Sequence, residues 1–220
     1  MKYTIAIDGP AGAGKSTIAK LLAKKLDILY LDTGAMYRAV GLKTIQEKID
    51  IQDIVKIDAI IEDINIKVRY IDGKQHTFLD DVDVSQKIRT SEVSLAASNV
   101  AVIKSVRLKM VELQRSIAGD QSVVMDGRDI GTYVLPNAQF KFFITATAEE
   151  RAKRRFLEMK ENGEKNVDYD IILEDIKYRD KNDSNRSFAP LRKAEDAILV
   201  DTTELSVDEV LQKVLANMNA

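Results

Sequence analysis

A glycine-rich run that follows a short apolar segment near the amino terminus restricts the possible folds more than any other feature of this chain. Residues 3–8 (YTIAID) are β-branched and apolar, which is typical of a buried strand. Residues 15–26 carry apolar side chains at helical spacing. Between them, residues 9–16 (GPAGAGKS) match the pattern G-x-x-x-x-G-K-S/T in full. The sequence therefore predicts a strand, a tight turn and a helix as consecutive elements.

Such a loop is suited to phosphate, because its backbone N–H groups wrap around the anion and the following helix adds partial positive charge. Lys15 is expected to reach the β- and γ-phosphates, and Ser16 to offer its hydroxyl to Mg²⁺. We prefer this hypothesis to an ordinary glycine-rich turn because the strand and the helix are both in place. The predicted ATP-binding residues are Gly9, Pro10, Ala11, Gly12, Ala13, Gly14, Lys15, Ser16 and Thr17.

The rest of the chain alternates apolar strands with helical segments. Buried strands are expected at residues 28–31, 122–126, 140–144 and 197–201. Helices are expected from Thr33, at about 52–63, 86–100 and 102–118, from a Thr147 capping box to Gly163, from Asp168 to about 182, and from a Ser206 capping box. The polar stretch 181–193 is expected to be a mobile loop. This alternation predicts an α/β fold, a five-stranded parallel sheet with helices on both faces.

One segment breaks the alternation. Residues 64–80 alternate apolar and polar side chains about Asp72-Gly73, which is typical of an antiparallel hairpin. We therefore predict an inserted α+β subdomain at about 62–100, between the two parts of a core domain at 1–61 and 101–220.

Composition excludes several classes of site. The 220 residues include no cysteine and a single histidine, His76, so disulfides, thiolate metal sites and a histidine-rich zinc site are ruled out. A net charge of −2 without a basic tail does not favour binding to a nucleic acid polymer. The apolar run at the amino terminus is shorter than a signal peptide, and no stretch reaches membrane-spanning length. We expect a cytoplasmic protein that does not bind membranes.

The glycine-rich loop fixes nucleotide binding but not the fate of the nucleotide. A GTPase-type switch would be expected to carry N-K-x-D and D-x-x-G segments, and the chain contains neither. Four arginines instead lie beside predicted turns and strand ends: Arg38, Arg128, Arg179 and Arg186. Three more lie on one predicted helix: Arg151, Arg154 and Arg155. Phosphoryl transfer between two phosphate chains needs several cations, so this pattern favours a kinase.

Five segments in this order resemble bacterial cytidylate kinases, which are nucleoside monophosphate kinases. They are GPAGAGKST (9–17), LDTGAMYR (31–38), KIRTSEVSLAASNVA (87–101), DGRDIGT (126–132) and RDKNDSNRSFAPL (179–191). The resemblance runs essentially from end to end. It implies that the insertion binds the monophosphate and that about 151–163 forms a short lid. Thr33 replaces a serine common in that family, and Ser16 stands where some members carry glycine.

The resemblance also implies roles for the residues of a second nucleotide site. Thr33 would lie near the cytosine, and Ser98, Arg107 and Asp129 would read the base. Arg38, Arg128 and Arg186 would hold the acceptor phosphate. Arg179 and Asp183 would bind the pentose. A carboxylate that accepts from the cytosine amino group, beside an arginine that donates to N3 or O2, would reject uracil, whose pattern is the opposite.

The expected reaction is transfer of the ATP γ-phosphoryl group to CMP, and to dCMP, by a monomer. Charge neutralisation by Lys15, Arg128, Arg155 and Arg186 is expected to drive it. Asp126 or Asp32, each at the end of a predicted strand, would help to hold Mg²⁺ through water; for Asp126, a turn aspartate is the alternative. Two other hypotheses stay open, a kinase for UMP, AMP or a small metabolite, and a nucleotide-gated binding module.

Overall fold

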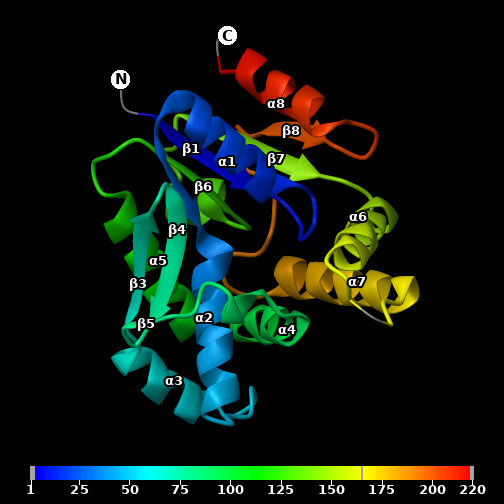
Figure 1. The fold of residues 1–220 in the computed structure, drawn as a ribbon. Helices are drawn as coiled ribbons and strands as arrows, with labels where there is room; N and C mark the ends of the chain where they lie inside the picture. Colours follow the sequence, from blue (N-terminus) through cyan, green and yellow to red (C-terminus); the bar gives the residue numbers. More distant parts are fainter. Residues whose placement is uncertain (1–2, 165, 219–220) are drawn as a thin grey trace.

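The computed structural model describes residues 3–164 and 166–218 and is organised around a five-stranded sheet (Figure 1). Its strands are β1 (Thr4–Asp8), β2 (Leu29–Asp32), β6 (Val123–Gly127), β7 (Phe140–Thr145) and β8 (Ile198–Asp201). All neighbours pair in parallel, in the order β2-β6-β1-β7-β8. The predicted parallel sheet is therefore confirmed, and β2 forms one of its edges.

Helices cover both faces of this sheet, as predicted. One face carries α1 (Lys15–Leu26) and α8 (Val207–Ala216), and the other carries α2 (Thr33–Gln46) and α5 (Lys104–Ala118). The central strand β1 shows why. Its side chains alternate, so that Ile5 and Ile7 lie in the core beneath α1 and α8 while Ala6 lies in the core beneath α2 and α5. All three side chains are fully buried.

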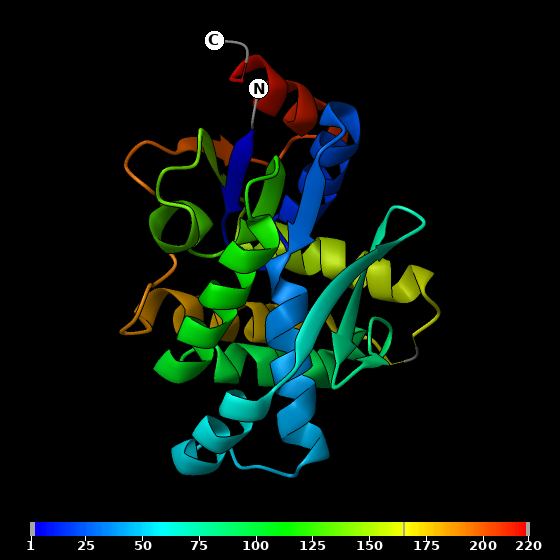
Figure 2. The same ribbon diagram turned by 90° about the vertical axis from the view of Figure 1, so that its left-hand side faces the viewer.

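A second, antiparallel sheet lies beside α2. It consists of β3 (Ile66–Ile71), β4 (Lys74–Leu79) and β5 (Val82–Asp83), and β3 and β4 turn at Asp72-Gly73, which confirms the predicted hairpin. In Figure 2 this hairpin runs alongside α2 toward the end of β2. It is preceded by α3 (Ile54–Asp63) and followed by a short 3₁₀ turn, Lys87–Arg89, and by α4 (Ser91–Val100). The subdomain boundary at 62–100 stays a prediction.

Two helix predictions are wrong in detail. The single helix expected at 86–100 is broken, because the extended backbone of Thr90 ends the 3₁₀ turn and its side chain accepts from Val93 N to begin α4. Helix α7 (Tyr169–Asn185) extends beyond the expected end near 182, into the stretch expected to be a loop. Asp183 lies buried in that last turn, where its carboxylate pairs with Arg128.

Helices α6 (Ala148–Glu161) and α7 form a small unit of their own. They pack around Ala152, Ile172 and Ile176, a buried cluster separate from the two cores of the sheet. Thr147 caps α6 by accepting from Glu150 N, but the Glu150 carboxylate pairs with Arg154, so only half of the predicted capping box forms. The capping box at Ser206 and Glu209 is complete.

Candidate active site

The loop between β1 and α1, residues 9–17, is named the donor cradle here. Gly9 has a φ of 146°, and a Cβ at this position would lie 1.9 Å from the carbonyl oxygen of Ile144 at the end of β7. Only glycine therefore allows the loop to turn so close to the neighbouring strand. Gly14 is left-handed, with a φ of 87°, and forms the N-cap of α1. The backbone N–H groups of the first turn of α1 are thus left for a ligand.

The Lys15 side chain is folded into the donor cradle and is 5% exposed. Its ammonium group donates to the carbonyl oxygen of Pro10 over 2.6 Å. Burial, followed by the positive charge of Arg128, lowers the pKa of Lys15 to about 7. A bound polyphosphate would place negative charge beside this ammonium group and would favour its charged form.

Asp126, at the end of β6, lies beside the donor cradle. Its carboxylate accepts from the Ser16 hydroxyl and from the Tyr30 hydroxyl, both over 2.8 Å, and its backbone oxygen accepts from the Thr33 hydroxyl over 2.7 Å. Burial, followed by the negative charge of Asp32, raises the pKa of Asp126. A further positive charge would be stabilised at this corner between β2, β6 and α1.

Asp32 ends β2 and is the N-cap of α2. One carboxylate oxygen accepts from Ala35 N over 2.9 Å, and the other accepts from the Arg38 guanidinium over 2.8 Å. Burial acts to raise the pKa of Asp32, but the charge of Arg38 and the Ala35 N–H outweigh it and hold this pKa below its ordinary value. Asp32 is thus a fixed anion that orients Arg38 at the start of α2.

A pocket next to these acids collects every residue predicted to bind the second nucleotide, and it is named the acceptor pocket here. Those nine residues are Thr33, Arg38, Ser98, Arg107, Arg128, Asp129, Arg179, Asp183 and Arg186. They come from α2, α4, α5, the segment after β6, and the end of α7. The structure therefore brings together residues that are up to 153 positions apart, from Thr33 to Arg186.

Buried ion pairs hold one end of the acceptor pocket. Arg107, 1% exposed, donates to the Asp129 carboxylate over 2.5 Å and to the carbonyl oxygen of Ala101 over 3.2 Å. Arg186 lies 3.5 Å from the other Asp129 oxygen and 3.5 Å from Asp183. Arg128 donates to Asp183 over 2.7 Å. The Asp129 and Arg107 side chains are therefore preorganised beside each other in a dry environment.

Unsatisfied polar atoms gather in the same pocket. Seven buried side-chain nitrogen and oxygen atoms of the described residues lack a hydrogen-bond partner, and four of them belong to pocket residues. These four are Tyr37 Oη, Arg38 Nε, Arg107 Nε and Arg186 Nη2. Buried groups of this kind are nearly always paired in folded proteins, so their concentration here indicates a missing polar ligand.

The Arg179 guanidinium is the clearest sign that this ligand is an anion. Within the described residues it has no hydrogen bond and no ion pair. Burial lowers the pKa of Arg179 to about 10, and so do the positive charges of Arg128, Arg38 and Arg155, although Asp183 opposes them. Cations that face one another in this way repel until an anion is placed among them.

The three arginines predicted to cluster on α6 have different surroundings. Arg151 is buried and binds Asp180 and the carbonyl oxygen of Ala11 in the donor cradle. Arg154 donates to Thr202. Arg155 is partly exposed and pairs with Glu158 over 2.9 Å. All three thus bind protein groups, and Arg155 does not line the acceptor pocket, although its charge acts on Arg179.

Three side chains of the site were missed by sequence reasoning. Tyr37 lines the acceptor pocket under the Arg107 guanidinium, 5.6 Å from ring centre to cation, and burial raises its pKa to about 12. Tyr30 binds Asp126. Asp8, at the end of β1, accepts from Ile130 N and Gly131 N, each over 2.7 Å, and so fixes the segment that carries Asp129. The one sequence signal that could have indicated Tyr37 is its position within the segment LDTGAMYR, which carries the family resemblance.

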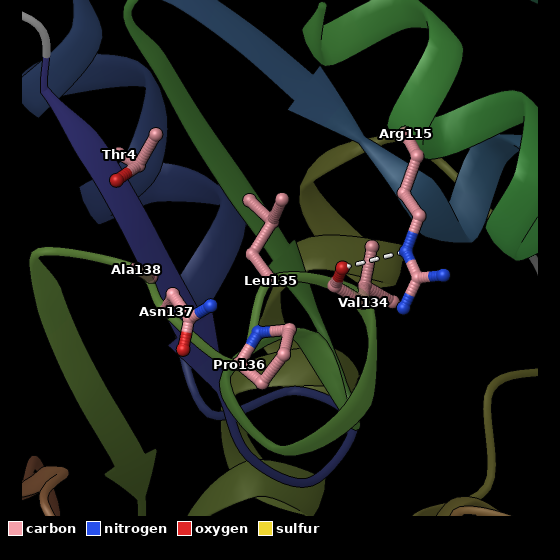
Figure 3. Close-up of a pocket in the computed structure, with 7 residues that line it drawn as sticks. All are labelled: Thr4, Arg115, Val134, Leu135, Pro136, Asn137 and Ala138. Atoms are coloured by element: carbon pink, nitrogen blue, oxygen red, sulfur yellow. Dashed lines mark hydrogen bonds between the residues drawn. The ribbon is translucent and has the colours of Figure 1, made fainter.

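A larger hollow, of about 540 Å³, lies elsewhere (Figure 3). It is lined by Thr4, Arg115 and residues 134–138, at the amino-terminal end of β1, whereas the donor cradle follows the carboxyl end of that strand. Arg115 is already engaged there by the carbonyl oxygens of Val134 and Tyr133. The charges that phosphate chemistry needs lie in the acceptor pocket, so we place the active site there and not in the larger hollow.

A P-loop on a five-stranded parallel sheet, beside a pocket lined by five arginines, defines a phosphotransferase of the P-loop kinase class. Comparison with known proteins gives the family. The family model described as cytidylate kinase matches residues 5–220. A cytidylate kinase of Caldicellulosiruptor bescii is 58% identical over 97% of this chain and 94% of the relative, and one of Bacillus subtilis is 48% identical over 97% and 95%. The chain belongs to the cytidylate kinase family.

A solved structure agrees on the fold. An uncharacterised protein from Eubacterium ventriosum superimposes with a TM-score of 0.57 at 16% identity, over 100% of this chain and 99% of its own. Neither comparison favours a binding module without enzymatic activity. In the part of the chain that the structure describes, no helix combines the length and the apolar character required to cross a membrane.

Proposed function

We propose that this protein transfers the γ-phosphoryl group of ATP to the 5′-phosphate of CMP, and of dCMP, giving ADP and the corresponding diphosphate. One observation carries the proposal. The donor cradle and the acceptor pocket adjoin at Asp126, whose carboxylate accepts from Ser16 of the cradle and whose backbone oxygen accepts from Thr33 of the pocket. Arg128 follows Asp126 by two residues and lines the pocket, so phosphates bound in the two places would lie close to this guanidinium, as transfer between two nucleotides requires.

The base of the acceptor is proposed to be read by Asp129 and Arg107. A carboxylate accepts from the cytosine N4 amino group, and a guanidinium donates to N3 or O2, whereas uracil would place an acceptor against Asp129. Both side chains are almost fully buried, so a mismatch would leave polar groups unpaired and costly. Ser98 and Thr33 line the same pocket and would add contacts around the base, and Arg179 and Asp183 would bind the pentose.

The chemistry is proposed to depend on position and charge. A nucleotide phosphate is already largely ionised near neutral pH, so neither a strong general base nor a covalent intermediate is needed. Lys15 and Arg128 would neutralise the charge on the transferring group, and Arg38 with Arg186 would hold the acceptor phosphate in line. Arg155, on the proposed lid of about 151–163, would join them when that segment closes and excludes water.

The residues beside the donor cradle suit a magnesium ion that is shared with the nucleotide. Among the described residues no group of three or more acidic, histidine or cysteine side chains could hold a metal ion alone. Magnesium commonly binds through one or two protein oxygens, water and substrate phosphates. Ser16, with Asp126 or Asp32 acting through water, would hold it. When bound, the ion would neutralise phosphate charge.

The test is an ADP-release assay with CMP, dCMP, UMP, AMP and GMP as acceptors. Rapid turnover with CMP and dCMP, and slow turnover with the other three, is the expected result. A preference for UMP or AMP would reject the base assignment while leaving a kinase. Slow ATP hydrolysis that no monophosphate accelerates would reject the kinase itself.

We further propose that the protein acts as a monomer in the cytoplasm, where its nucleotide substrates are. One chain supplies all nine of the residues proposed to bind the acceptor, which supports activity without a partner. Light scattering during turnover would test the monomer.

A further inference from the structure

The outer edge of β2 is completed by two side chains of the hairpin. As an edge strand, β2 has backbone groups with no strand beside them. The Tyr70 hydroxyl donates to the carbonyl oxygen of Tyr30 over 2.6 Å. The Gln75 side-chain amide accepts from Asp32 N over 2.8 Å and donates to Asp32 O over 3.2 Å. The amide of Gln75 thus pairs with Asp32 as a residue of a neighbouring strand would.

Asp32 is the residue on which Arg38 depends. Gln75 holds both backbone groups of Asp32, while the Asp32 carboxylate caps α2 and binds Arg38 over 2.8 Å. The space around this pair is tight, because a Cβ on Gly34 would lie 3.1 Å from both Arg38 Nη1 and Asp32 Oδ1. A small displacement of the Asp32 backbone would therefore be passed directly to the guanidinium.

This contact is not what keeps the hairpin on the protein. The other end of the hairpin is anchored by Ile66 and Leu79, both buried in the core beneath α2. The tip is exposed, with Tyr70 at 39% and Ile71 at 43%. Hydrophobic burial at the base holds the hairpin in place, so the polar contacts near the tip are not needed to attach it to the protein.

We propose that Gln75 is a positioning residue for the acceptor phosphate, acting through Asp32 and Arg38, with Tyr70 as a weaker second tie. The inference rests on the proposed function and adds to it. It gives the hairpin a role in catalysis without any contact between the hairpin and the nucleotide. It also means that a shift of the hairpin relative to β2 would change the hold on the acceptor phosphate more than the hold on ATP, because Gln75 has no hydrogen bond to the donor cradle.

The test replaces Gln75 with methionine, which keeps the volume and removes both hydrogen bonds. We expect KM for CMP to rise about tenfold, because misplacing a substrate clamp by a fraction of an ångström has effects of this size. KM for ATP should change much less than KM for CMP, since Gln75 has no hydrogen bond to residues 9–17 of the donor cradle. Lys74→Met, an exposed neighbour on the same strand, is the matched control. Tyr70→Phe should raise KM for CMP by about twofold only.

A double-mutant cycle separates positioning from general destabilisation. If Gln75 acts through Arg38, Gln75→Met should have almost no further effect on KM for CMP in an Arg38→Met background. Multiplicative effects in the double variant, an unchanged KM in Gln75→Met, or an equal rise in both KM values would overturn the proposal.

Binding of inorganic phosphate by calorimetry gives a readout that needs no turnover. Gln75→Met should weaken phosphate binding to the unliganded protein severalfold, and the effect should again vanish with Arg38→Met. If the wild-type protein fails to phosphorylate CMP, the proposed function fails, while this binding cycle still decides the role of Gln75. If Gln75→Met binds phosphate as tightly as the wild type does, the proposed positioning role of Gln75 is wrong.

Discussion

The donor cradle and the acceptor pocket are proposed to bind the same chemical group, phosphate, by opposite means. The cradle is one continuous stretch of nine residues that offers backbone N–H groups, and its shape is set by where glycine allows the chain to turn. The pocket offers side chains from five separate parts of the fold, and its cations repel one another. A site built from backbone is fixed by local conformation, whereas one built from charged side chains depends on how distant elements pack.

The largest expected effect separates the two sites at Lys15. Lys15→Ala should lower kcat by about 10³-fold or more, because it removes the ammonium group proposed to neutralise the transferring charge. KM for CMP should stay within about threefold, since Lys15 does not line the acceptor pocket. Steady-state kinetics check this, with Lys24→Ala on the exposed face of α1 as control. A wild-type rate would refute the role of the cradle.

A smaller effect is expected for base selection in the acceptor pocket. Asp129→Asn keeps the shape of the side chain but replaces one acceptor oxygen with a donor, and it removes the charge opposite Arg107. The ratio of kcat/KM for CMP over UMP should fall by about 10- to 100-fold. Competition between the two acceptors in one reaction measures this ratio. If Asp129→Asn leaves the preference for CMP over UMP unchanged, Asp129 does not read the base.

Arg179 should show the cost of a pocket built from unpaired charge. Arg179→Met is expected to lower kcat/KM for CMP about tenfold, yet to raise the free energy of unfolding by about 0.5–1 kcal/mol, because it removes repulsion in the unliganded protein. Kinetics and urea unfolding of the same samples give both values. Arg192→Met, exposed on the surface, is the control. A loss of stability would contradict the repulsion argument.

The smallest expected effect concerns protons in the donor cradle. The pKa of Lys15 is about 7 in the unliganded protein, and a bound triphosphate would raise it by favouring the charged form. As pH rises above 7, ATP binding should therefore take up as much as about one proton, and affinity should fall. Calorimetry at pH 8 in buffers of different ionisation enthalpy measures the uptake. Lys15→Met should abolish it, and uptake that survives this change would point to another group.

The same contrast decides how much of the molecule was predictable. The donor cradle, the parallel sheet and the hairpin follow from local pattern, and the structure has those elements. The nine pocket residues came from family resemblance, because nothing in the sequence around Arg38 indicates that Arg186 lies near it. Tyr30 and Asp8 were missed because their partners, Asp126 and the segment after it, lie about 100 residues away.

Charged clusters on a helix were the hardest feature to interpret. Arg151, Arg154 and Arg155 look equivalent in the sequence, since helical spacing gives each the same claim to a ligand. In the structure their partners differ: Arg151 binds Asp180 on α7, Arg154 binds Thr202 after β8, and the partly exposed Arg155 binds Glu158 on its own helix. The partners of Arg151 and Arg154 come into place only when α7 and the segment after β8 pack against α6, so no local pattern reveals them.

The separate cluster beneath α6 and α7 has a consequence for local unfolding of the protein. With three buried residues, Ala152, Ile172 and Ile176, this helix pair has far less apolar packing to lose than the sheet, so it should open locally without global unfolding. Its amide hydrogens should exchange early, and a protease should cut there first. Arg151 links this helix pair to the donor cradle by donating to the carbonyl oxygen of Ala11. If ATP closes the pair over the cradle, its amide hydrogens should exchange more slowly when ATP is added.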